Sequence, residues 1–354
     1  MAFYQCPNCK KIWQYPIEKC PECFLALERM KSEKIKVIGV SKVTIPALFH
    51  PKIPYFVLVL EDEKGNKWVQ KSIKEYKIGE GFKYESSKDK NTVAIWRIKY
   101  DFFEGIEKVI DLLGGLAPHQ KSWWEAKILI LPTLISPVHP YFAENTSPQF
   151  LEATIKYLME KGAKIENIKV TGQSFDEIPI EASTQKSQLL KTCQDYKILL
   201  LDLAKTNFIK KQEGDFVFEI SEEVFNADLI INLPILKTGK ISASENILKF
   251  LKKENYFGLK HLYSEEEIIE NLNKILPDFL TIADGQNIQK SNKFTAFLGL
   301  TLASFNPLNL DRVFAEIVTL QSSFLPGPLK KVKIGDIPIV GRRIEEVQYE
   351  VEKL

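Results

Sequence analysis

Four cysteines near the start of the chain constrain its fold more than any other feature. They form two Cys-Pro-x-Cys turns in the stretch CPNCKKIWQYPIEKCPEC, and ten residues separate the turns. Each turn can present two thiolates to one ion, so the two turns together complete a tetrahedron of sulfur around a metal. The predicted metal ligands are Cys6, Cys9, Cys20 and Cys23.

The identity of the metal follows from the ligand type. Tetrahedral sulfur suits zinc or a single iron ion. In iron-binding rubredoxins a glycine usually follows each second cysteine, whereas Lys10 and Phe24 stand at those positions here. We therefore expect zinc. Because four thiolates leave no coordination position for water or substrate, the metal is expected to fold a zinc ribbon at residues 1–32 and not to catalyse a reaction.

The length and charge of the chain suggest more than one module. A chain of 354 residues is expected to form two or three domains. Residues 1–100 carry 19 Lys and Arg against 11 Asp and Glu, a net charge of +8, although the whole chain carries only +2. A basic N-terminal part is compatible with nucleic acid, with a phosphate-bearing ligand such as coenzyme A, with an acidic partner, or with a plain solvated surface.

The sequence gives no sign of a membrane segment. The longest apolar stretch, ILILPTLI at 128–135, is much shorter than the roughly 18 residues that a membrane-spanning helix needs. The first ten residues lack the basic and apolar regions of a secretory signal. Four cysteines in metal spacing with Cys193 alone fit a reducing compartment. We expect a cytoplasmic protein.

Residues 33–100 have the pattern of a small β-domain. Short apolar runs such as YFVLVLED and TVAIWRIKY are separated by turns at Gly65 and at Gly79-Glu80-Gly81, with no helical period. Four to six short strands of this size predict a small closed barrel of the oligomer-binding (OB) type. The stretch DFFEGIEKVIDLLGG then predicts a linker helix within 101–121.

The first hundred residues resemble the family called domain of unknown function 35, in which a rubredoxin-like ribbon precedes an OB barrel. The cysteine spacing carries the resemblance, together with PYFVLV at 54–59 and IGEG at 78–81. The resemblance implies a partner enzyme of the thiolase type or an acyl-coenzyme A ligand. It implies no catalytic residue in this module.

Binding of single-stranded nucleic acid is the alternative for the barrel. OB barrels bind single strands by stacking bases on exposed aromatic side chains above a basic groove. Aromatic side chains at alternating strand positions are more often core residues or cross-strand pairs. The candidates are Tyr55, Phe56, Trp68, Tyr76, Phe82, Tyr84 and Trp96.

Residues 122–354 predict an α/β domain with a mostly parallel sheet. Six apolar runs have the length and composition of buried strands, and most are separated by helical segments such as SPQFLEATIKYLMEKG. The runs lie at 127–133, 168–174, 197–203, 229–239, 279–285 and 300–307. There is no Gly-x-Gly-x-x-Gly and no phosphate-binding loop of the Walker type.

Polar residues follow each of these strands and form the candidate site. In an open parallel sheet, ligands bind at the carboxyl ends of the strands. We expect Lys237 to bind an anionic group and Asp284 to act with it as the second catalytic residue. Asp311 is open to two interpretations, a cation ligand beside Asp284 and Asn232 or a first-turn acid of a helix. The predicted substrate-binding residues are Asn232, Thr238, Ser304, Asn306, Ser174 and Thr133.

About residues 122–334 resemble the family called domain of unknown function 362. The motifs occur in order: ADLIINLP at 227–234, Lys237-Thr238, Asp284-Gly285, and Leu302-Ala303-Ser304 running on to Asp311. Three departures matter. The first strand ends in Leu-Pro-Thr where the family commonly has Lys-Pro-Asn, Gly239 replaces a frequent histidine, and a ferredoxin segment is missing. The resemblance thus implies a fold and a site location, but no reaction.

These observations predict a two-module metalloprotein. We expect the α/β domain to handle an anionic substrate, an acyl-coenzyme A, a carboxylate or a phosphate, as an enzyme or as a subunit of an enzyme complex. The ribbon and barrel would dock a partner enzyme or present the ligand. The alternative is a non-catalytic adaptor or single-stranded nucleic-acid-binding protein that acts through the barrel.

Overall fold

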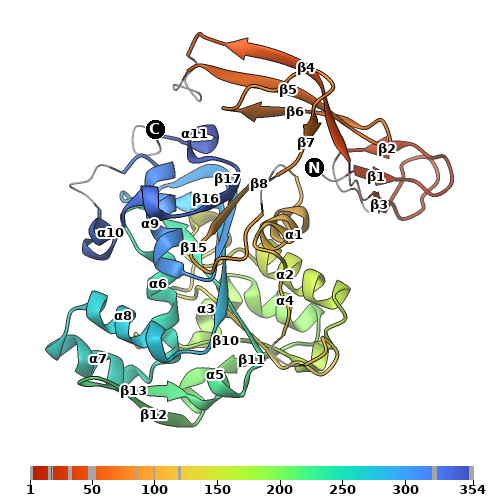
Figure 1. Ribbon diagram of the computed structural model, residues 1–354. Coiled ribbons are helices and arrows are strands. Elements are labelled where there is room, and N and C mark those ends of the chain that lie inside the picture. Colours follow the sequence, from red (N-terminus) through yellow and green to blue (C-terminus); the bar gives the residue numbers. More distant parts are fainter. Residues whose placement is uncertain are drawn as a thin grey trace.

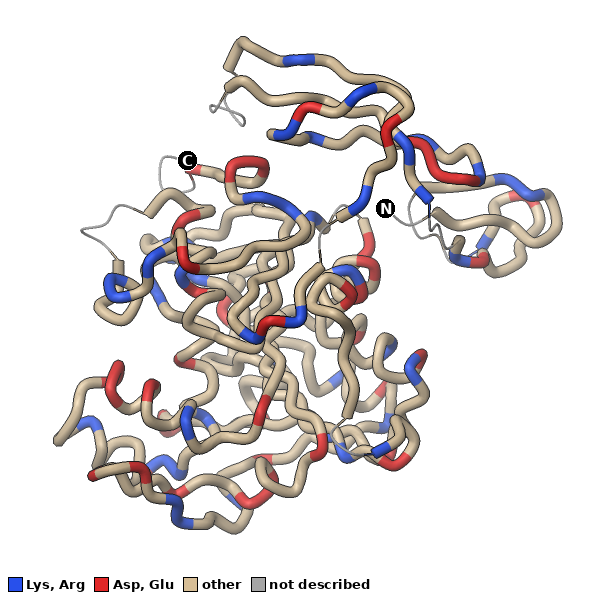
Figure 2. Tube along the Cα trace, viewed as in Figure 1, with Lys and Arg blue, Asp and Glu red and all other residues tan. Residues whose placement is uncertain are grey.

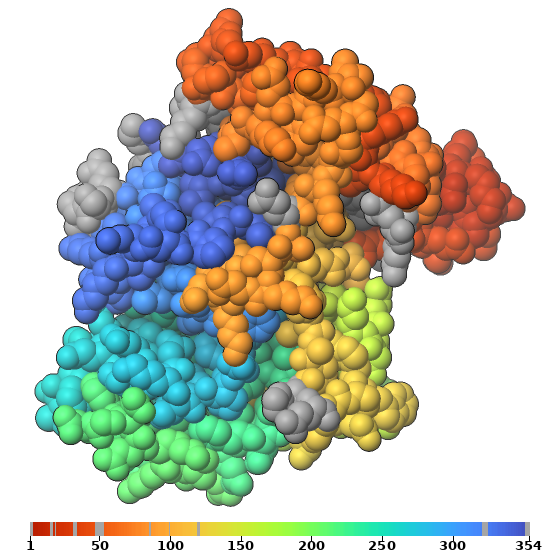
Figure 3. All heavy atoms as spheres, in the orientation of Figure 1, coloured from red at the N-terminus to blue at the C-terminus, as the bar shows by residue number. Residues whose placement is uncertain are grey.

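The chain forms a small N-terminal module seated on one end of a larger α/β domain (Figures 1 and 3). The computed structural model describes residues 3–14, 17, 19–30, 34–46, 53–84, 86–98, 100–118, 121–320 and 325–350. None of the helices within these ranges combines the length and the apolar character that crossing a bilayer requires.

The N-terminal module contains two small antiparallel sheets. The first has the order β2-β1-β3 and holds the cysteines; its strands are β1 (Phe3–Gln5), β2 (Ile12–Trp13) and β3 (Glu28–Met30). The second has the order β6-β5-β4-β7, with β4 (Ile35–Val43), β5 (Tyr55–Asp62), β6 (Lys67–Ser72) and β7 (Gly81–Phe82). Phe3 of the first sheet packs into the apolar core of the second, beside Leu58 and Trp68. The predicted closed OB barrel is not confirmed, because this sheet is open.

The strand expected to complete the barrel belongs to the other domain. β8 (Val93–Arg97) pairs with two strands of the large sheet, β17 (Thr295–Ser304) and β18 (Ile339–Gly341). The physical reason is its composition: Val93 and Ile95 enter one core cluster, while Ala94 and Trp96 enter another. A strand that is buried on both faces needs a layer of structure on each side. The small sheet cannot supply this, so the predicted barrel at 33–100 ends before β8.

The large sheet has the order β11-β10-β9-β14-β16-β17-β8-β18, and β15 pairs with β16 beside this path. The first five strands are mutually parallel. Their bounds, with β15, are β9 (Ile128–Pro132), β10 (Ile168–Gly172), β11 (Leu199–Asp202), β14 (Leu229–Leu233), β15 (Ile235–Lys237) and β16 (Phe279–Gln289). All six predicted apolar runs are strands, and the run 229–239 is divided at Pro234 between β14 and β15.

The sheet is mixed, because β16 and β17 form an antiparallel hairpin. Residues 290–294 join them, and so short a connection cannot cross over to a parallel strand. β17 therefore runs opposite to the strands before it. As a result, its carboxyl end lies at the amino-terminal edge of the parallel part of the sheet.

Helices cover both faces of the sheet, as the alternation of strands and helices predicted. α1 (Phe102–Leu112) and α2 (Pro148–Glu160) pack on the face that includes Ile128 and Ile130. α8 (Glu265–Ile275) belongs to the cluster of the opposite face, with Leu129 and Ile230, and α9 (Pro307–Ile317) covers β8 and β17. α1, the predicted linker helix, is thus part of the domain core.

The predicted helix boundaries of α2 are confirmed. Ser147 caps the helix by accepting a hydrogen bond from the Phe150 N–H, and Pro148 is its first residue. Gly162 follows with φ of 97°, the left-handed conformation that ends many helices. The remaining helices are α3 (Ile180–Lys186), α4 (Leu189–Asp195), α5 (Glu222–Asn226), α6 (Ser242–Asn246), α7 (Lys253–Leu262), α10 (Gly327–Lys331) and α11 (Ile344–Val347).

A separate antiparallel hairpin, β12 (Phe208–Glu213) and β13 (Phe216–Ser221), lies at the far end of the α/β domain from the N-terminal module (Figure 1).

Candidate functional site

The four cysteines of the N-terminal module converge on one point. Their sulfur atoms all lie within 4.8 Å of one another, and the Sγ atoms of Cys9 and Cys20 are 3.7 Å apart. A tetrahedron with metal–sulfur bonds of about 2.3 Å has edges of about 3.8 Å. Cys6 and Cys20 are fully buried, and Cys9 and Cys23 are half-buried. The cluster could hold a metal such as zinc.

The backbone builds the two halves of this cluster alike. In the first turn the N–H of Lys10 donates to the Cys6 carbonyl, and in the second the N–H of Phe24 donates to the Cys20 carbonyl, at 3.1 and 2.9 Å. Lys10 has φ of 60° and Phe24 has φ of 55°. Both positions therefore need the left-handed conformation that glycine adopts most easily, and here two larger residues adopt it.

In the α/β domain, the order of the strands reverses between β9 and β14. From β9 the chain proceeds to β10 and β11 on one side, and it later returns to β14 on the other. Ligands of open α/β sheets bind at the carboxyl ends of the strands beside such a reversal. Thr133 follows β9 and Asn232 lies near the end of β14, so two of the predicted substrate-binding residues lie at this point.

Both side chains are buried and bonded to α6. The Thr133 hydroxyl donates to Asn246 Oδ1 at 3.0 Å, and Asn246 Nδ2 donates to Asn232 Oδ1 at 2.8 Å. Asn232 Nδ2 in turn donates to the Ala243 carbonyl at 2.9 Å and to Thr281 Oγ1 at 3.1 Å. This closed network fixes α6 over the ends of β9 and β14.

Asp311 holds the first turn of the same helix. Its carboxylate accepts hydrogen bonds from the backbone N–H groups of Ala243 and Ser244, each at 2.9 Å. Asp311 is fully buried in α9, and burial raises its pKa to about 7. The carboxylate thus ties α9 to α6, which differs from both interpretations that the sequence left open.

Asp284 is also buried, on β16. Its Oδ2 accepts a hydrogen bond from the backbone N–H of Ser147 at 3.1 Å, and its Oδ1 accepts one from the N–H of Gln286 at 3.2 Å. Burial raises the pKa of Asp284. Its neighbour on β15 is Ile235. Within the described residues, no ion pair joins Asp284 to Lys237.

Lys237 ends β15, and its side chain is largely withdrawn from water. Its backbone N–H donates to Ser242 Oγ at 3.1 Å, but its amine makes no hydrogen bond or ion pair with any described residue. Burial lowers the pKa of Lys237 to about 8, while the negative charges of Glu144 and Glu245 act in the opposite direction.

The two glutamates near Lys237 come from different elements. Glu144 lies before α2 and accepts hydrogen bonds from Ser136 Oγ and, at 3.3 Å, from Gln289 Nε2. Glu245 lies on α6, and burial raises its pKa. A lysine with a lowered pKa beside a glutamate with a raised pKa is a combination that often marks functional sites.

The other predicted substrate-binding residues are dispersed. Ser304 pairs in register with Thr281 at the opposite end of the strands from Lys237, because β17 is antiparallel. Its hydroxyl donates to the Thr92 carbonyl at 2.8 Å. Ser174 follows β10 and bonds within its own turn, to Asp176. Thr238 is buried beside Lys237, where its N–H donates to the Gln289 carbonyl at 2.9 Å. Ser304 and Ser174 therefore do not join Lys237.

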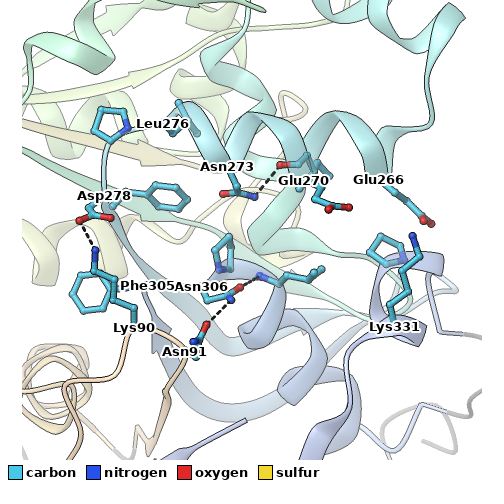
Figure 4. A pocket seen from close by; sticks show the side chains of 16 residues that line it. Lys90, Asn91, Glu266, Glu270, Asn273, Leu276, Asp278, Phe305, Asn306 and Lys331 are labelled. Atoms are coloured by element: carbon cyan, nitrogen blue, oxygen red, sulfur yellow. Dashed lines mark hydrogen bonds and ion pairs between the residues drawn. The ribbon is translucent and has the colours of Figure 1, made fainter. Parts of the chain in front are cut away.

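Asn306 lies at a cavity of about 520 Å³ on the amino-terminal edge of the sheet. Figure 4 shows this cavity between α8 and the start of α9, with the Lys90–Asp278 ion pair at one side. Asn306 is committed to helix capping, since its Oδ1 accepts from the N–H groups of Leu308 and Asn309 and its Nδ2 donates to Asn91.

Sequence reasoning missed the residues that surround Lys237 and α6. Glu144, Thr146, Glu245 and Asn246 lie in loops or in a five-residue helix, and such segments have no periodic pattern. One signal was available: the polar stretch SASEN follows the Lys237-Thr238 step after only three residues. A polar segment directly after a buried strand is a candidate to fold back over the strand ends.

Comparisons with known proteins find a family match within the α/β domain. No curated protein matches. A similar solved structure is described as "Ltp2-ChsH2(DUF35) aldolase"; the N-terminal part is weakly linked to it, at 20% identity over 24% of this chain and 72% of that chain, with a TM-score of 0.21. That likeness is too low to carry an argument. Residues 128–316 match the family described as "Domain of unknown function (DUF362)". Because this match covers more than half of the chain, the protein belongs to the DUF362 family.

Proposed function

We propose that the α/β domain binds an anionic small molecule through Lys237, and that the protein acts on this ligand as an enzyme or as a subunit of an enzyme complex. The ligand class is a carboxylate, a phosphate or an acyl-coenzyme A. The observation that carries the proposal is the buried amine of Lys237, which no described residue pairs. A buried ammonium without a partner is costly, and an anionic ligand would supply the missing charge.

The surroundings of Lys237 also suit proton transfer. With a pKa of about 8, its amine can gain or lose a proton near neutral pH more readily than an exposed lysine can. Burial also raises the pKa of Glu245. Groups whose pKa values lie near the working pH are efficient general acids and bases. Lys237 would thus bind the anion, with Glu245 as its candidate proton-exchange partner.

The buried polar residues would act as the support of this site. The network of Thr133, Asn232 and Asn246 fixes α6, which carries Glu245. Asp284 holds the Ser147 N–H at the start of α2, close in sequence to Glu144. These contacts favour positioning roles for Thr133, Asn232 and Asp284, in place of the direct ligand contacts expected from the sequence.

The N-terminal module is proposed to dock a partner protein or to present the ligand, with its cysteines holding structural zinc. The closed four-sulfur arrangement supports a structural ion, since it leaves no position for substrate.

A ligand screen tests the Lys237 site. The melting temperature of the full chain would be measured in the presence of phosphate, small carboxylates, coenzyme A or acetyl-coenzyme A. A ligand that binds only the folded state raises the melting temperature. We expect such a rise with at least one anion and its loss in Lys237→Met. The matched control is Lys240→Met, which removes an exposed amine in the turn that follows β15. The proposal would be refuted if no anion raised the melting temperature, or if Lys237→Met and Lys240→Met lost the rise equally.

Single-stranded nucleic acid is the less favoured ligand. Of the seven aromatic side chains that could stack bases, five are buried: Tyr55, Phe56, Trp68, Phe82 and Trp96. Acidic residues are interspersed among the basic ones along the module (Figure 2), and Lys36 and Lys67 both pair with Glu61. The buried aromatic side chains favour core packing over base stacking. The mixture of charges favours an ordinary surface over a basic groove for a nucleic-acid strand.

A further inference from the structure

A groove of about 340 Å³ lies where the two modules meet. β6 of the N-terminal module supplies Trp68, Val69 and Gln70, and the α/β domain supplies side chains from β8, β17 and the turn after β18. This volume falls within the usual range of small-molecule sites, roughly 300–1,000 Å³. The groove is separate from Lys237, which is not among its lining residues.

Two arginines line this groove, and neither has a carboxylate partner at ion-pair distance among the described residues. The Arg97 guanidinium makes no hydrogen bond or ion pair with them. Arg342 leaves its buried Nε without a hydrogen-bond partner, and its Nη1 makes only a long contact of 3.5 Å to the Lys71 carbonyl. Burial, and then the positive charge of Arg342, lower the pKa of Arg97. Two guanidinium groups held this close repel each other, and a bound anion would relieve the repulsion.

Aromatic and apolar surface lies beside these arginines. Phe297, on β17, is 59% exposed although it lines the groove, and Val69 opposite on β6 is 66% exposed. The Arg342 guanidinium lies 5.4 Å from the centre of the Trp96 ring. Exposed aromatic faces and planar guanidinium groups are the surfaces on which nucleobases stack.

A carboxylate and a side-chain amide also line the groove. Glu104 is the one acidic side chain among the described residues of the lining, and its carboxylate is an acceptor only. Gln70 already accepts a hydrogen bond from the Tyr84 hydroxyl and donates to the Lys71 carbonyl. Glu104 can therefore accept hydrogen bonds from a ribose or from an exocyclic amine.

We propose that this groove is a binding site for a mononucleotide, with the phosphate on Arg97 and Arg342 and the base against Phe297. The combination of two arginines, an open aromatic ring and a carboxylate in one groove of this size matches a phosphate, a planar base and a hydroxylated sugar. A ligand there contacts both modules, so its binding strengthens their association. The proposal does not depend on the function proposed for Lys237.

Titration of the full chain with adenosine monophosphate tests the proposal, with adenosine and inorganic phosphate as partial ligands. Tryptophan fluorescence is a suitable signal because Trp68 and Trp96 line the groove; calorimetry provides the second readout. We expect saturable binding of the nucleotide, at least about tenfold tighter than binding of either partial ligand. Arg97→Gln and Arg342→Gln should each weaken it about tenfold, as expected for the loss of charge-assisted hydrogen bonds. Phe297→Ala should weaken nucleotide and adenosine alike.

Controls make the outcome decisive. Lys191→Gln removes an exposed positive charge on α4, away from the groove, and should leave binding unchanged. The Arg97 guanidinium makes no hydrogen bond or ion pair with any described residue, so its variant should fold even if Arg342→Gln does not. No saturable binding, equal affinity for adenosine, or unchanged affinity in Arg97→Gln would overturn the proposal. Coenzyme A binding with no response to the mononucleotide would also overturn it.

Discussion

Asp311 on α9 accepts a hydrogen bond from the backbone N–H of Ala243 on α6, although the two residues are 68 positions apart in the sequence. The second carboxylate oxygen accepts the next N–H, that of Ser244. Two of the unpaired N–H groups at the start of α6 are thereby satisfied by one side chain. The position of α6, and with it that of Glu245 beside Lys237, depends on this contact.

Asp311→Ala is therefore expected to destabilise the fold. It leaves two buried N–H groups without acceptors, and each such group costs about 1–3 kcal/mol. We expect the free energy of unfolding, measured with urea, to fall by about 2–5 kcal/mol. Asp336→Ala, in a 3₁₀ turn of the same domain, is an exposed control. If Asp311→Ala lowered the free energy of unfolding no more than Asp336→Ala does, α6 would not depend on Asp311.

The pH dependence of Asp311 provides a second prediction. Its pKa in the folded protein, about 7, lies above the ordinary value of 3.8. Between these values the folded state binds more protons than the unfolded state, so stability should fall as pH rises from 5 to 7. Asp311→Asn lacks this titrating group. Its free energy of unfolding should therefore change less steeply with pH, and the difference in slope should be up to about 1.4 kcal/mol per pH unit. Urea unfolding curves at several pH values measure this, and parallel profiles for the two proteins would contradict it.

Lys237 should give the opposite behaviour at alkaline pH. Its folded pKa of about 8 lies below the ordinary 10.5, so the folded state loses its proton first, and stability should rise between pH 8 and 10.5. At pH 7 the amine is charged, and burial of this charge lowers the stability of the folded state. We expect Lys237→Met to be more stable than wild type there by on the order of 1–2 kcal/mol, with the difference vanishing toward pH 10.5.

The exposed Lys240→Met is the control for this measurement. It removes an amine three residues away that lies in water. A constant difference between Lys237→Met and wild type from pH 7 to pH 10.5 would show that the amine is not buried as described.

The sequence was sufficient for features that are local or periodic. The six buried strands and the capped helix α2 follow from apolar runs and from Ser147-Pro148, and the cysteine cluster follows from spacing alone. Each of these depends on contacts among residues near one another in the chain, or on burial that one strand's composition already implies. Such features are predictable without knowing how the strands are ordered.

The errors arose where the pairing of distant segments decides the structure. β8 is buried on both faces, but this composition does not name its partner strands, and its pairing with β17 places it in the large sheet. The direction of β17 moved Ser304 away from Lys237, although both follow buried strands. The partners of Asn232 and Thr133 on α6 are likewise set by the reversal of strand order, which no local pattern encodes.

The cysteine turns predict a stabilising substitution. Phe24 is 75% exposed and adopts φ of 55°. A left-handed conformation costs a residue with a Cβ atom roughly 1–2 kcal/mol, whereas glycine adopts it freely. Phe24→Gly should therefore retain zinc longer against a chelator, with a severalfold slower rate of release. Phe24→Ala keeps the strain and loses the ring, and it should release zinc like wild type; equal rates in all three proteins would contradict the prediction.

Removal of the metal should affect only the first module. The sheet β2-β1-β3 has few apolar residues, and four thiolates without an ion repel one another once ionised. In hydrogen-exchange measurements, we expect a strong chelator to remove the protection of the amides of β1–β3. The amides of β9 and β14 should stay protected. Cys20→Ser should behave like the chelated protein, and Cys193→Ser, which alters a buried cysteine outside the cluster, should bind the metal normally. Loss of protection throughout the α/β domain would contradict this separation.

Arg29 on β3 is expected to anchor this metal-binding sheet to the α/β domain. Its guanidinium lies 2.6 Å from the carboxylate of Glu107 on α1, with four-fifths of both side chains buried, and 4.9 Å from the centre of the Phe103 ring. A partly buried arginine–carboxylate pair is stronger than an exposed one.

In a double-mutant cycle with Arg29→Met and Glu107→Gln, we expect a coupling of about 1–2 kcal/mol, read from the exchange protection of the β3 amides. The exposed pair Lys205–Glu181 is the matched control and should couple by less than about 0.5 kcal/mol. Equal coupling in the two pairs would show that Arg29 contributes no more than a surface charge.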